Sequence, residues 1–209
     1  MTIRAVVFDI GGVLELVDDA SWPHCWMASW ERRLGLDTGA FATGLATHAP
    51  GGSVVTGEVS EAQMRLMYQD ALGLDDVDTD ELIREMWDAY CGELDIELFD
   101  YFVSLRSNYK TGILSNSGDG ARREEQRRFG FQDVTDDIVY SHEVGLAKPD
   151  PKIYALTSDR LGVLPDEIVF LDDLPANVDA AREAGWHAVV HRDSNASITE
   201  LGVILSAHP

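Results

Sequence analysis

Short, nearly continuous apolar runs recur along the chain, separated by stretches whose apolar residues are spaced as on one face of a helix. The runs are rich in β-branched residues and predict buried strands at residues 3–9, 111–115, 137–141, 167–172 and 186–190. Strands alternating with helices are typical of an α/β fold with a parallel sheet. Because these strands are apolar on both faces, we expect helices to cover the sheet on both sides.

Start and stop signals delimit several of the helices. Pro175 opens a helical pattern that Gly185 closes, as expected from the preference for Pro at the start of a helix and Gly just past its end. A second helix is predicted over residues 94–107, and it leads into the second strand. The sequence therefore predicts strand–helix units on both sides of a long intervening segment.

That segment, residues 16–93, contains no convincing buried strand and several amphipathic stretches. One begins with Ser60-Glu61-Ala62-Gln63, which matches a capping box, and another covers residues 82–90. We therefore predict a helical cap subdomain over 16–93, inserted into a discontinuous core domain formed by 1–15 and 94–209.

Three tryptophans lie at the start of the inserted segment. Trp22, Trp26 and Trp30 recur every four residues, so we expect them to share one face of a helix. Large aromatic side chains at helical spacing favour core packing over a role in lining a substrate pocket.

Charge narrows the classes of partner. The net charge is -21 and the sequence pI is about 4.4, which argues against nucleic acid and anionic membrane surfaces as partners. The lysines are only Lys110, Lys148 and Lys152, so an anionic substrate would depend on few cations. We expect an acidic, solvated surface and a small-molecule partner.

Two further features bear on location. The two cysteines, Cys25 and Cys91, are not in a metal-binding spacing, and no apolar run approaches the roughly 18 residues needed to span a bilayer. The first residues lack the basic flank and long apolar stretch of a secretion signal. We therefore expect a cytoplasmic protein.

Polar residues follow the predicted strands, where parallel sheets bind ligands. Asp9 ends the first strand, residues 115–116 (Ser-Asn) end the second, and residues 172–173 (Asp-Asp) end the fourth. Lys148 follows the third strand, and Pro149 keeps it out of a helix. A buried carboxylate needs a partner, and adjacent carboxylates are best tolerated beside a divalent cation. The pattern indicates a reaction centre for an anionic group.

Four motifs together resemble those of the haloacid dehalogenase superfamily. They are Val-Val-Phe-Asp-Ile-Gly-Gly-Val-Leu (6–14), Ile-Leu-Ser-Asn (113–116), Lys-Pro-Asp-Pro-Lys-Ile-Tyr (148–154) and Val-Phe-Leu-Asp-Asp (169–173). Residues 145–190 look most similar to the branch that contains bacterial sugar-phosphate phosphatases and the N-terminal phosphatase domain of soluble epoxide hydrolases. The resemblance implies a three-layer α/β/α core with a parallel sheet and an inserted helical cap.

The resemblance also implies a Mg²⁺-dependent phosphatase that acts on a small phosphorylated metabolite through an aspartyl-phosphate intermediate. Asp9 would be the nucleophile and Lys148 would neutralise charge. The other implied roles are phosphate binding by Ser115 and Asn116, metal ligation by Asp9, Gly11, Asp172 and Asp173, and support of a metal-bound water by Asn177. The oligomeric state stays open between a monomer and a homodimer.

Gly11 departs from the family pattern, since most phosphatases of the family have a second Asp there that acts as general acid and base. Glycine can offer Mg²⁺ only its carbonyl oxygen, and general acid–base help is typically worth 10²–10⁴-fold in rate. The nearby candidates for a substitute proton donor are Glu15, Asp18, Asp19 and His24.

Two alternative functions follow from the same residues. A metal-independent 2-haloacid dehalogenase would need no proton donor, which fits Gly11, although such enzymes usually lack the paired acids at 172–173. A non-catalytic binding or regulatory protein could keep the fold without turnover. Sensitivity to EDTA distinguishes the phosphatase from the dehalogenase.

Overall fold

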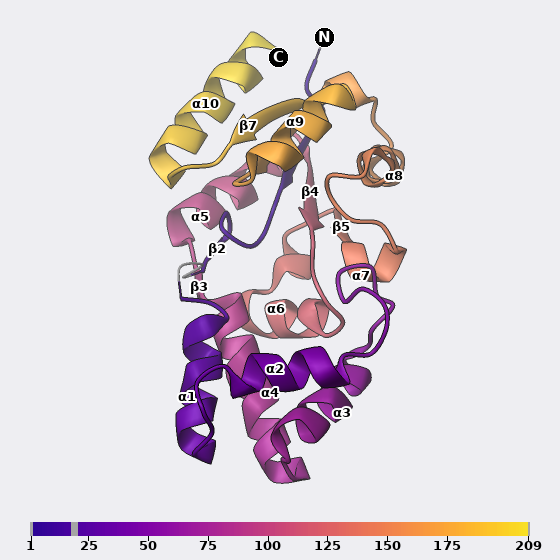
Figure 1. The fold of residues 1–209 in the computed structure, drawn as a ribbon. Coiled ribbons are helices and arrows are strands. Elements are labelled where there is room, and N and C mark those ends of the chain that lie inside the picture. The colour runs from indigo at the N-terminus through magenta and orange to yellow at the C-terminus, as the bar shows by residue number, and fades with distance from the viewer. Residues whose placement is uncertain (1, 18–20, 209) are drawn as a thin grey trace.

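The computed structural model describes residues 2–17 and 21–208, and within them a parallel sheet forms the centre of the upper half in Figure 1. The strand order is β5-β4-β1-β6-β7, and every neighbouring pair is parallel. The strands are β1 (Ala5–Phe8), β4 (Lys110–Ser115), β5 (Asp137–Tyr140), β6 (Ile168–Asp172) and β7 (His187–Val190). The five strands predicted from the apolar runs, and the α/β class, are confirmed.

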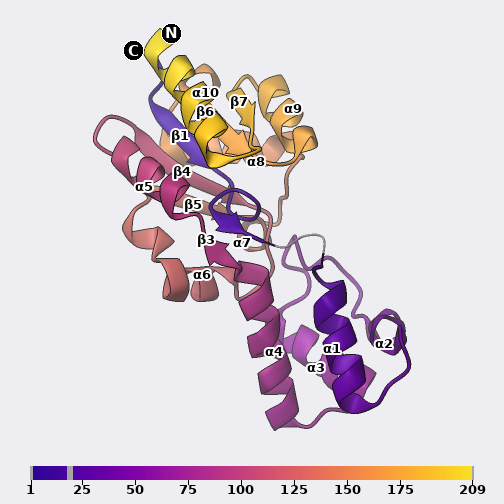
Figure 2. The same cartoon turned by 90° about the vertical axis from the view of Figure 1, so that its left-hand side faces the viewer.

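The two faces of the sheet pack against different helices. Val6 and Phe8 belong to the apolar cluster that includes Phe102 of α5 (Ile96–Leu105) and Leu201 of α10 (Ser194–Ala207). The alternate residues of β1 point the other way, and Val7 packs with residues of α8 (Pro151–Leu161) and α9 (Pro175–Glu183). Successive side chains of a strand point to opposite faces, so an entirely apolar strand needs cover on both. Figure 2 shows the resulting three layers.

Shorter elements complete the core. They are α6 (Ala121–Phe129), α7 (Ser141–Val144) and the 3₁₀ helices η1 (Phe131–Asp133) and η2 (Pro165–Glu167). The predicted helix that opens at Pro175 is α9, and Gly185 follows its end with a positive φ of 93°. The helix expected over 94–107 is shorter than predicted, because Asp95 caps it with its side chain and Leu94 belongs to a strand.

A helical insert lies between β1 and α5 and forms the lower half of the molecule in Figures 1 and 2. A short antiparallel ribbon of β2 (Glu15–Leu16) and β3 (Glu93–Leu94) connects it to the core. Its helices are α1 (His24–Leu34), α2 (Ala40–His48), α3 (Glu61–Leu72) and α4 (Asp76–Cys91). The capping box at Ser60 and Gln63 is present at the start of α3. The division into domains at residues 16 and 93 stays a prediction.

The expectation that three tryptophans share one helix face is wrong for Trp22, which precedes the first residue of α1. Its ring packs against that of Trp26, with the ring centroids 5.5 Å apart. Trp30 is fully buried, and its indole Nε1 donates a hydrogen bond to Glu85 of α4 over 2.8 Å. Pro23 separates Trp22 from the helix, so spacing alone is a poor guide to the position of Trp22.

No helix within the described residues is long and apolar enough to cross a membrane.

Candidate active site

The polar residues predicted at the strand ends converge at one edge of the sheet. Asp9 follows β1, Ser115 is the last residue of β4, and Asp172 is the last residue of β6. Phe8 lies opposite both Ile113 and Leu171, so the three strands end at nearly the same level. This is the edge at which open parallel sheets bind ligands.

Lys148 lies at the centre of this group of residues. Its Nζ is 2.7 Å from Asp9 Oδ1 and 2.7 Å from Asp172 Oδ2. The side chain of Lys148 is 1% exposed, that of Asp172 0% and that of Asp9 10%, so the ion pairs are almost completely removed from water. Coulomb interactions are much stronger here than at the surface, and loss of one partner would leave a buried charge uncompensated.

Asn116 fixes the backbone at Lys148. Its side-chain Nδ2 donates to the carbonyl oxygen of Lys148 over 2.9 Å, and its Oδ1 accepts from the backbone N–H of Lys148 over 2.8 Å. Both polar atoms of the Asn116 side-chain amide therefore form hydrogen bonds with the backbone of a residue 32 positions away in the sequence. Asn116 also lines the pocket at Asp9, and its predicted role in binding phosphate stays a prediction.

Asp172 is held from the opposite side. Asn177 Nδ2 lies 3.0 and 3.1 Å from its two carboxylate oxygens, and the N–H of Leu174 donates to Oδ1 over 2.9 Å. With Lys148 on Oδ2, both oxygens already accept hydrogen bonds. Asn177 also lines the pocket at Asp9, and its predicted support of a metal-bound water stays a prediction.

The electrostatics follow from this burial. Burial raises the pKa of Asp9 to about 7; Lys148 opposes the rise and the negative charge of Asp172 adds to it. Burial by itself lowers the pKa of Lys148, but Asp9 and Asp172 outweigh it and the pKa is raised. Lys148 therefore stays charged. Positive charge near Asp9 favours the deprotonated form of its carboxyl group.

Three carboxylates meet at this site around a single lysine. Asp9, Asp172 and Asp173 each offer an oxygen within 4.8 Å of those of the other two. Oxygen donors with excess negative charge suit a hard divalent cation such as Mg²⁺. Gly12 makes room for Asp173, because a Cβ at position 12 would lie only 2.8 Å from Asp173 Oδ2. The backbone of Gly12 also has a φ of +72°, which favours glycine. The residues present therefore fit the predicted metal.

Gly11 differs from Gly12 in this respect. A Cβ at Gly11 would come no nearer to another residue than 4.0 Å, from Val17, and the φ of Gly11 is not positive. A β-carbon at position 11 therefore has room, whereas one at position 12 does not. The general acid that the family pattern would place at position 11 is absent from the sequence.

Glu15 is the notable acid near this gap. It lines a pocket of about 220 Å³ together with Asp9, Gly11, Lys148 and Asp173. The residue is 1% exposed, and burial, with the nearby charges of Glu125 and Asp9 adding to it, raises the pKa of Glu15 to about 10. The carboxyl group is therefore protonated at neutral pH.

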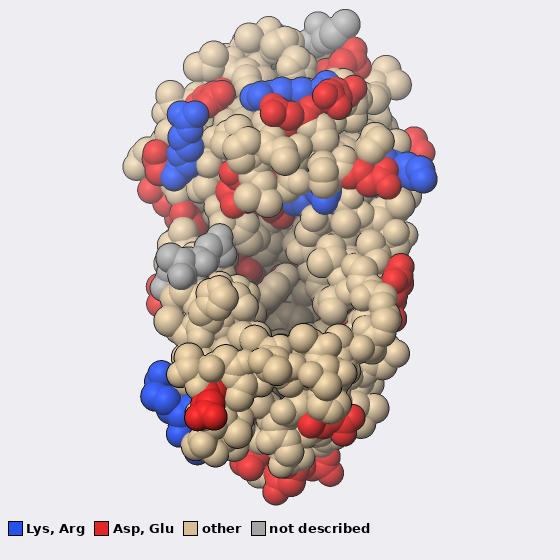
Figure 3. Space-filling model, in the orientation of Figure 1, with Lys and Arg blue, Asp and Glu red and all other residues tan. Residues whose placement is uncertain are grey.

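The other candidate proton donors differ from Glu15. His24 is exposed at the start of α1, and Asp18 and Asp19 lie outside the described residues. The pocket is also lined by Trp22, for which the sequence favoured core packing over lining a pocket, and by Tyr90, for which the sequence indicated no role in a site. Figure 3 shows the hollow between the core and the insert, with tan, uncharged residues on the side of the insert and charged atoms on the side of the core.

Comparison with known proteins places these features in a family. Residues 3–185 match the family model of a hydrolase, the haloacid dehalogenase-like hydrolase. The chain is 30% identical over 218 residues to bifunctional epoxide hydrolase 2 of Sus scrofa, covering 96% of this chain but only 38% of that protein. It is 26% identical over 217 residues to D-ribitol-5-phosphate phosphatase of Bacteroides thetaiotaomicron, covering 98% of this chain and 100% of that protein.

The fold has solved counterparts. The crystal structure of a haloacid dehalogenase family enzyme from Bacteroides thetaiotaomicron, in complex with magnesium and inorganic phosphate, matches with a TM-score of 0.75. The match covers 91% of this chain and 94% of that chain at 22% identity. At this identity the likeness concerns the fold.

Proposed function

The chain belongs to the haloacid dehalogenase-like hydrolase family, and from this premise we propose that it is a Mg²⁺-dependent phosphatase acting on a small phosphate monoester. One observation carries the proposal: a buried lysine bridges Asp9 and Asp172 at the sheet edge where Asp173 adds a third carboxylate. The match to the family model confirms the resemblance seen in the four motifs.

Asp9 is the proposed nucleophile. Its Oδ1 accepts hydrogen bonds from Lys148 and from the N–H of Ile10, which hold the carboxylate in place. An oxygen of Asp9 forms a bond to phosphorus as the ester P–O bond breaks, and the departing alkoxide takes up a proton, whose donor is proposed below. Water then attacks phosphorus, releases inorganic phosphate and restores the carboxylate.

Charge neutralisation is the main work of the surrounding residues, because phosphoryl transfer depends chiefly on positioning and electrostatics. Lys148, held rigid by Asn116 and Asp172, supplies a fixed positive charge beside the reacting carboxylate. We propose that the hydroxyl of Ser115 and the backbone N–H groups of residues 116 and 118 receive the phosphoryl oxygens, while the N–H of Ser117 donates to Ser141 Oγ over 2.9 Å.

Asp9, Asp173 and the carbonyl of Gly11 are the proposed Mg²⁺ ligands. When bound, the ion would stabilise negative charge on the phosphoryl group and hold it in line with Asp9. Asp172 belongs to the same acidic cluster, but its oxygens are taken by Lys148, Asn177 and Leu174. We therefore propose that Asp172 positions Lys148 and does not bind the metal directly.

Glu15 is our candidate for the proton donor that Gly11 cannot supply. It lines the same pocket as Asp9, and its buried carboxyl group retains a proton at neutral pH. A protonated acid beside a departing alkoxide is the arrangement that general acid catalysis requires.

The proposal is tested by a phosphate-release assay over small phosphate esters, with 2-haloacids in parallel. The phosphatase predicts release of phosphate with Mg²⁺, loss of that activity in EDTA and its return when Mg²⁺ is added in excess. Halide release that persists in EDTA would support the dehalogenase instead. A complete lack of turnover on both substrate classes would favour the non-catalytic alternative.

A further inference from the structure

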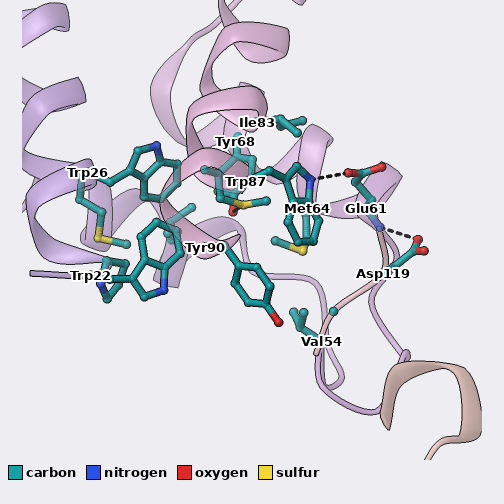
Figure 4. Close-up of a pocket in the computed structure, with 15 residues that line it drawn as sticks. Trp22, Trp26, Val54, Glu61, Met64, Tyr68, Ile83, Trp87, Tyr90 and Asp119 are labelled. Atoms are coloured by element: carbon teal, nitrogen blue, oxygen red, sulfur yellow. Dashed lines mark hydrogen bonds between the residues drawn. The ribbon is translucent and has the colours of Figure 1, made fainter. Parts of the chain in front are cut away.

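A second cavity of about 290 Å³ lies between the helices of the insert and the core residues Gly118 and Asp119, next to the pocket at Asp9. Trp22 and Tyr90 line both spaces, so the cavity continues from the site of phosphoryl transfer. Figure 4 shows its walls, which come mainly from α1, α3 and α4. The apolar residues among them are Trp22, Pro23, Trp26, Met27, Leu45, Val54, Met64, Tyr68, Ile83, Met86, Trp87 and Tyr90.

Most of the polar groups near this cavity that have a hydrogen-bond partner are engaged with one another, whereas Trp26 Nε1 is buried without a partner among the described residues. Glu61 accepts a hydrogen bond from Trp87 Nε1 over 2.8 Å and pairs with Arg123 over 2.8 Å. The N–H of Glu61 donates to Asp119 Oδ2 over 2.9 Å. The dashed lines in Figure 4 mark the hydrogen bonds that join Glu61 to Trp87 and to Asp119. The hydroxyl of Tyr68 is directed at the sulfur of Met86, 3.4 Å away. A ligand rich in hydroxyl groups would find few partners among the described residues.

The shape of the cavity argues against ordinary core packing. Met64 and Ile83 face it from α3 and α4, and both are only partly buried although each is a large apolar side chain. Natural cores are filled to the density of organic crystals, so an open apolar space of this size beside a reaction centre indicates a binding site. Its volume is near the lower limit of about 300 Å³ for small-molecule sites, which favours a compact group over a long chain.

We propose that this cavity receives the carbon group of the substrate, and that the substrate is the phosphate monoester of a compact, apolar, preferably aromatic alcohol. The inference rests on the proposed phosphatase function. The phosphoryl group would lie at Asp9, while the ring passes between Trp22 and Tyr90 into the insert. Aromatic walls suit a flat ring through stacked and edge-to-face contacts, whereas the hydroxyls of a sugar would lose their water without replacement.

The experiment compares primary alkyl phosphates, whose leaving groups have similar intrinsic reactivity. We expect kcat/KM for 3-phenylpropyl phosphate to exceed that for a pentitol phosphate by roughly 100-fold, within the range that apolar pocket contacts supply. Ethyl phosphate, which has the phosphoryl group but nothing to fill the cavity, should be turned over slowly. A pentitol phosphate that equals or exceeds the phenylpropyl ester would overturn the inference.

Met64→Gln places a polar group in the cavity wall, and Leu66→Gln is its matched control on the same helix, because Leu66 is 59% exposed. Met64→Gln should lower kcat/KM for 3-phenylpropyl phosphate about tenfold relative to kcat/KM for ethyl phosphate. Leu66→Gln should change neither value. Equal losses on both substrates, or none in Met64→Gln, would contradict a role for the cavity in substrate binding.

Failure of the phosphatase proposal can be recognised separately. If neither ethyl phosphate nor any other ester is hydrolysed, the proposed function fails, but the cavity can still be tested by binding. Trp22, Trp26 and Trp87 line it, so 3-phenylpropylphosphonate should change their fluorescence. A pentitol phosphonate should not, and Met64→Gln should weaken the response. Binding of both phosphonates with equal affinity would count against the inference.

Discussion

The α/β core and the helical insert distribute charge in opposite ways. In the core, Lys148, Asp9 and Asp172 are buried together at the end of the sheet. In the insert, ion pairs such as Arg33–Glu81 are on the surface, while apolar side chains surround an internal cavity. Charges in a low-dielectric site interact strongly and tolerate little displacement, whereas apolar contacts depend mainly on area and fit. The difference suggests that the core carries out phosphoryl transfer and that the insert selects the substrate.

The largest expected difference between the two regions concerns their ion pairs. Lys148→Met removes the cation between two buried carboxylates, and we expect it to abolish phosphate release and to destabilise the metal-free protein by about 3–5 kcal/mol. Arg33→Met is the matched change in the insert. Its ion pair with Glu81 is exposed, so the melting temperature and activity should hardly change.

Thermal unfolding and phosphate release measure both variants. Mg²⁺ should restore part of the lost stability of Lys148→Met without restoring activity, since a cation can relieve the repulsion between the carboxylates. If the two substitutions were equally mild, the core would not depend on its buried charges, and the contrast drawn here would be wrong.

This contrast also explains how far the sequence could be interpreted. Strands such as β1 and β6 are apolar on both faces, and polar residues such as Asp9 and Asp172 follow them, so the sheet and its reactive edge could be predicted. The roles of Asn116 and Asn177 could not, because their partners, Lys148 and Asp172, are brought near by tertiary structure.

The insert was harder to interpret for a related reason. Helical periodicity predicts an apolar face but not whether that face packs completely or leaves a cavity. Trp22 shows the limit: its spacing matched a helix, yet it precedes α1 and lines both pockets. Tyr90 carries no local signal that would distinguish it from a packing residue.

Glu15 lies in the short ribbon between the two regions and gives the next largest effect. Glu15→Gln should lower kcat for alkyl phosphates about 100-fold, because the amide cannot release a proton to the alkoxide. An ester with an acidic leaving group, such as 4-nitrophenyl phosphate, should be nearly unaffected. A loss that is equal for the two leaving groups would count against a role in proton donation.

Gly11→Asp provides a rescue of that variant. A β-carbon at position 11 has room, and Gly11 lines the same pocket as Asp9, so an aspartate there would offer that pocket an acid. We therefore expect Glu15→Gln combined with Gly11→Asp to recover much of the activity towards alkyl phosphates. The rescue should be measured as kcat, with the melting temperature as a control for folding.

A smaller effect concerns pH. Burial raises the pKa of Asp9 to about 7. Burial also raises the pKa of Glu125 to about 8, although a hydrogen bond from Tyr140 to Glu125 acts in the opposite direction. In the insert, Arg65 and Gln69 lower the pKa of Asp76 through hydrogen bonds. An acidic group whose pKa is raised by folding binds its proton more tightly in the folded state than in the unfolded state. The metal-free protein should therefore become more stable as pH falls from 8 to 5. The stabilisation by Asp76 should be lost only at lower pH.

Melting temperatures in EDTA across pH 5–8 test this prediction, with Glu125→Gln as the control variant. Each proton that the folded state retains contributes a slope of about 1.4 kcal/mol per pH unit, so removal of one group should flatten the curve. Burial lowers the pKa of His142 and of His191, which opposes this trend, so the comparison with Glu125→Gln decides: an equal slope in the two proteins would show that Glu125 is not held in the raised state.

The most direct test of the account is Asp9→Asn assayed beside the wild-type chain in a phosphate-release experiment with Mg²⁺. The asparagine is nearly isosteric and cannot form the phosphoryl ester, so we predict a correctly folded protein that binds 3-phenylpropylphosphonate but releases no phosphate above background. Release of phosphate at the wild-type rate would contradict the assignment of Asp9 as the nucleophile.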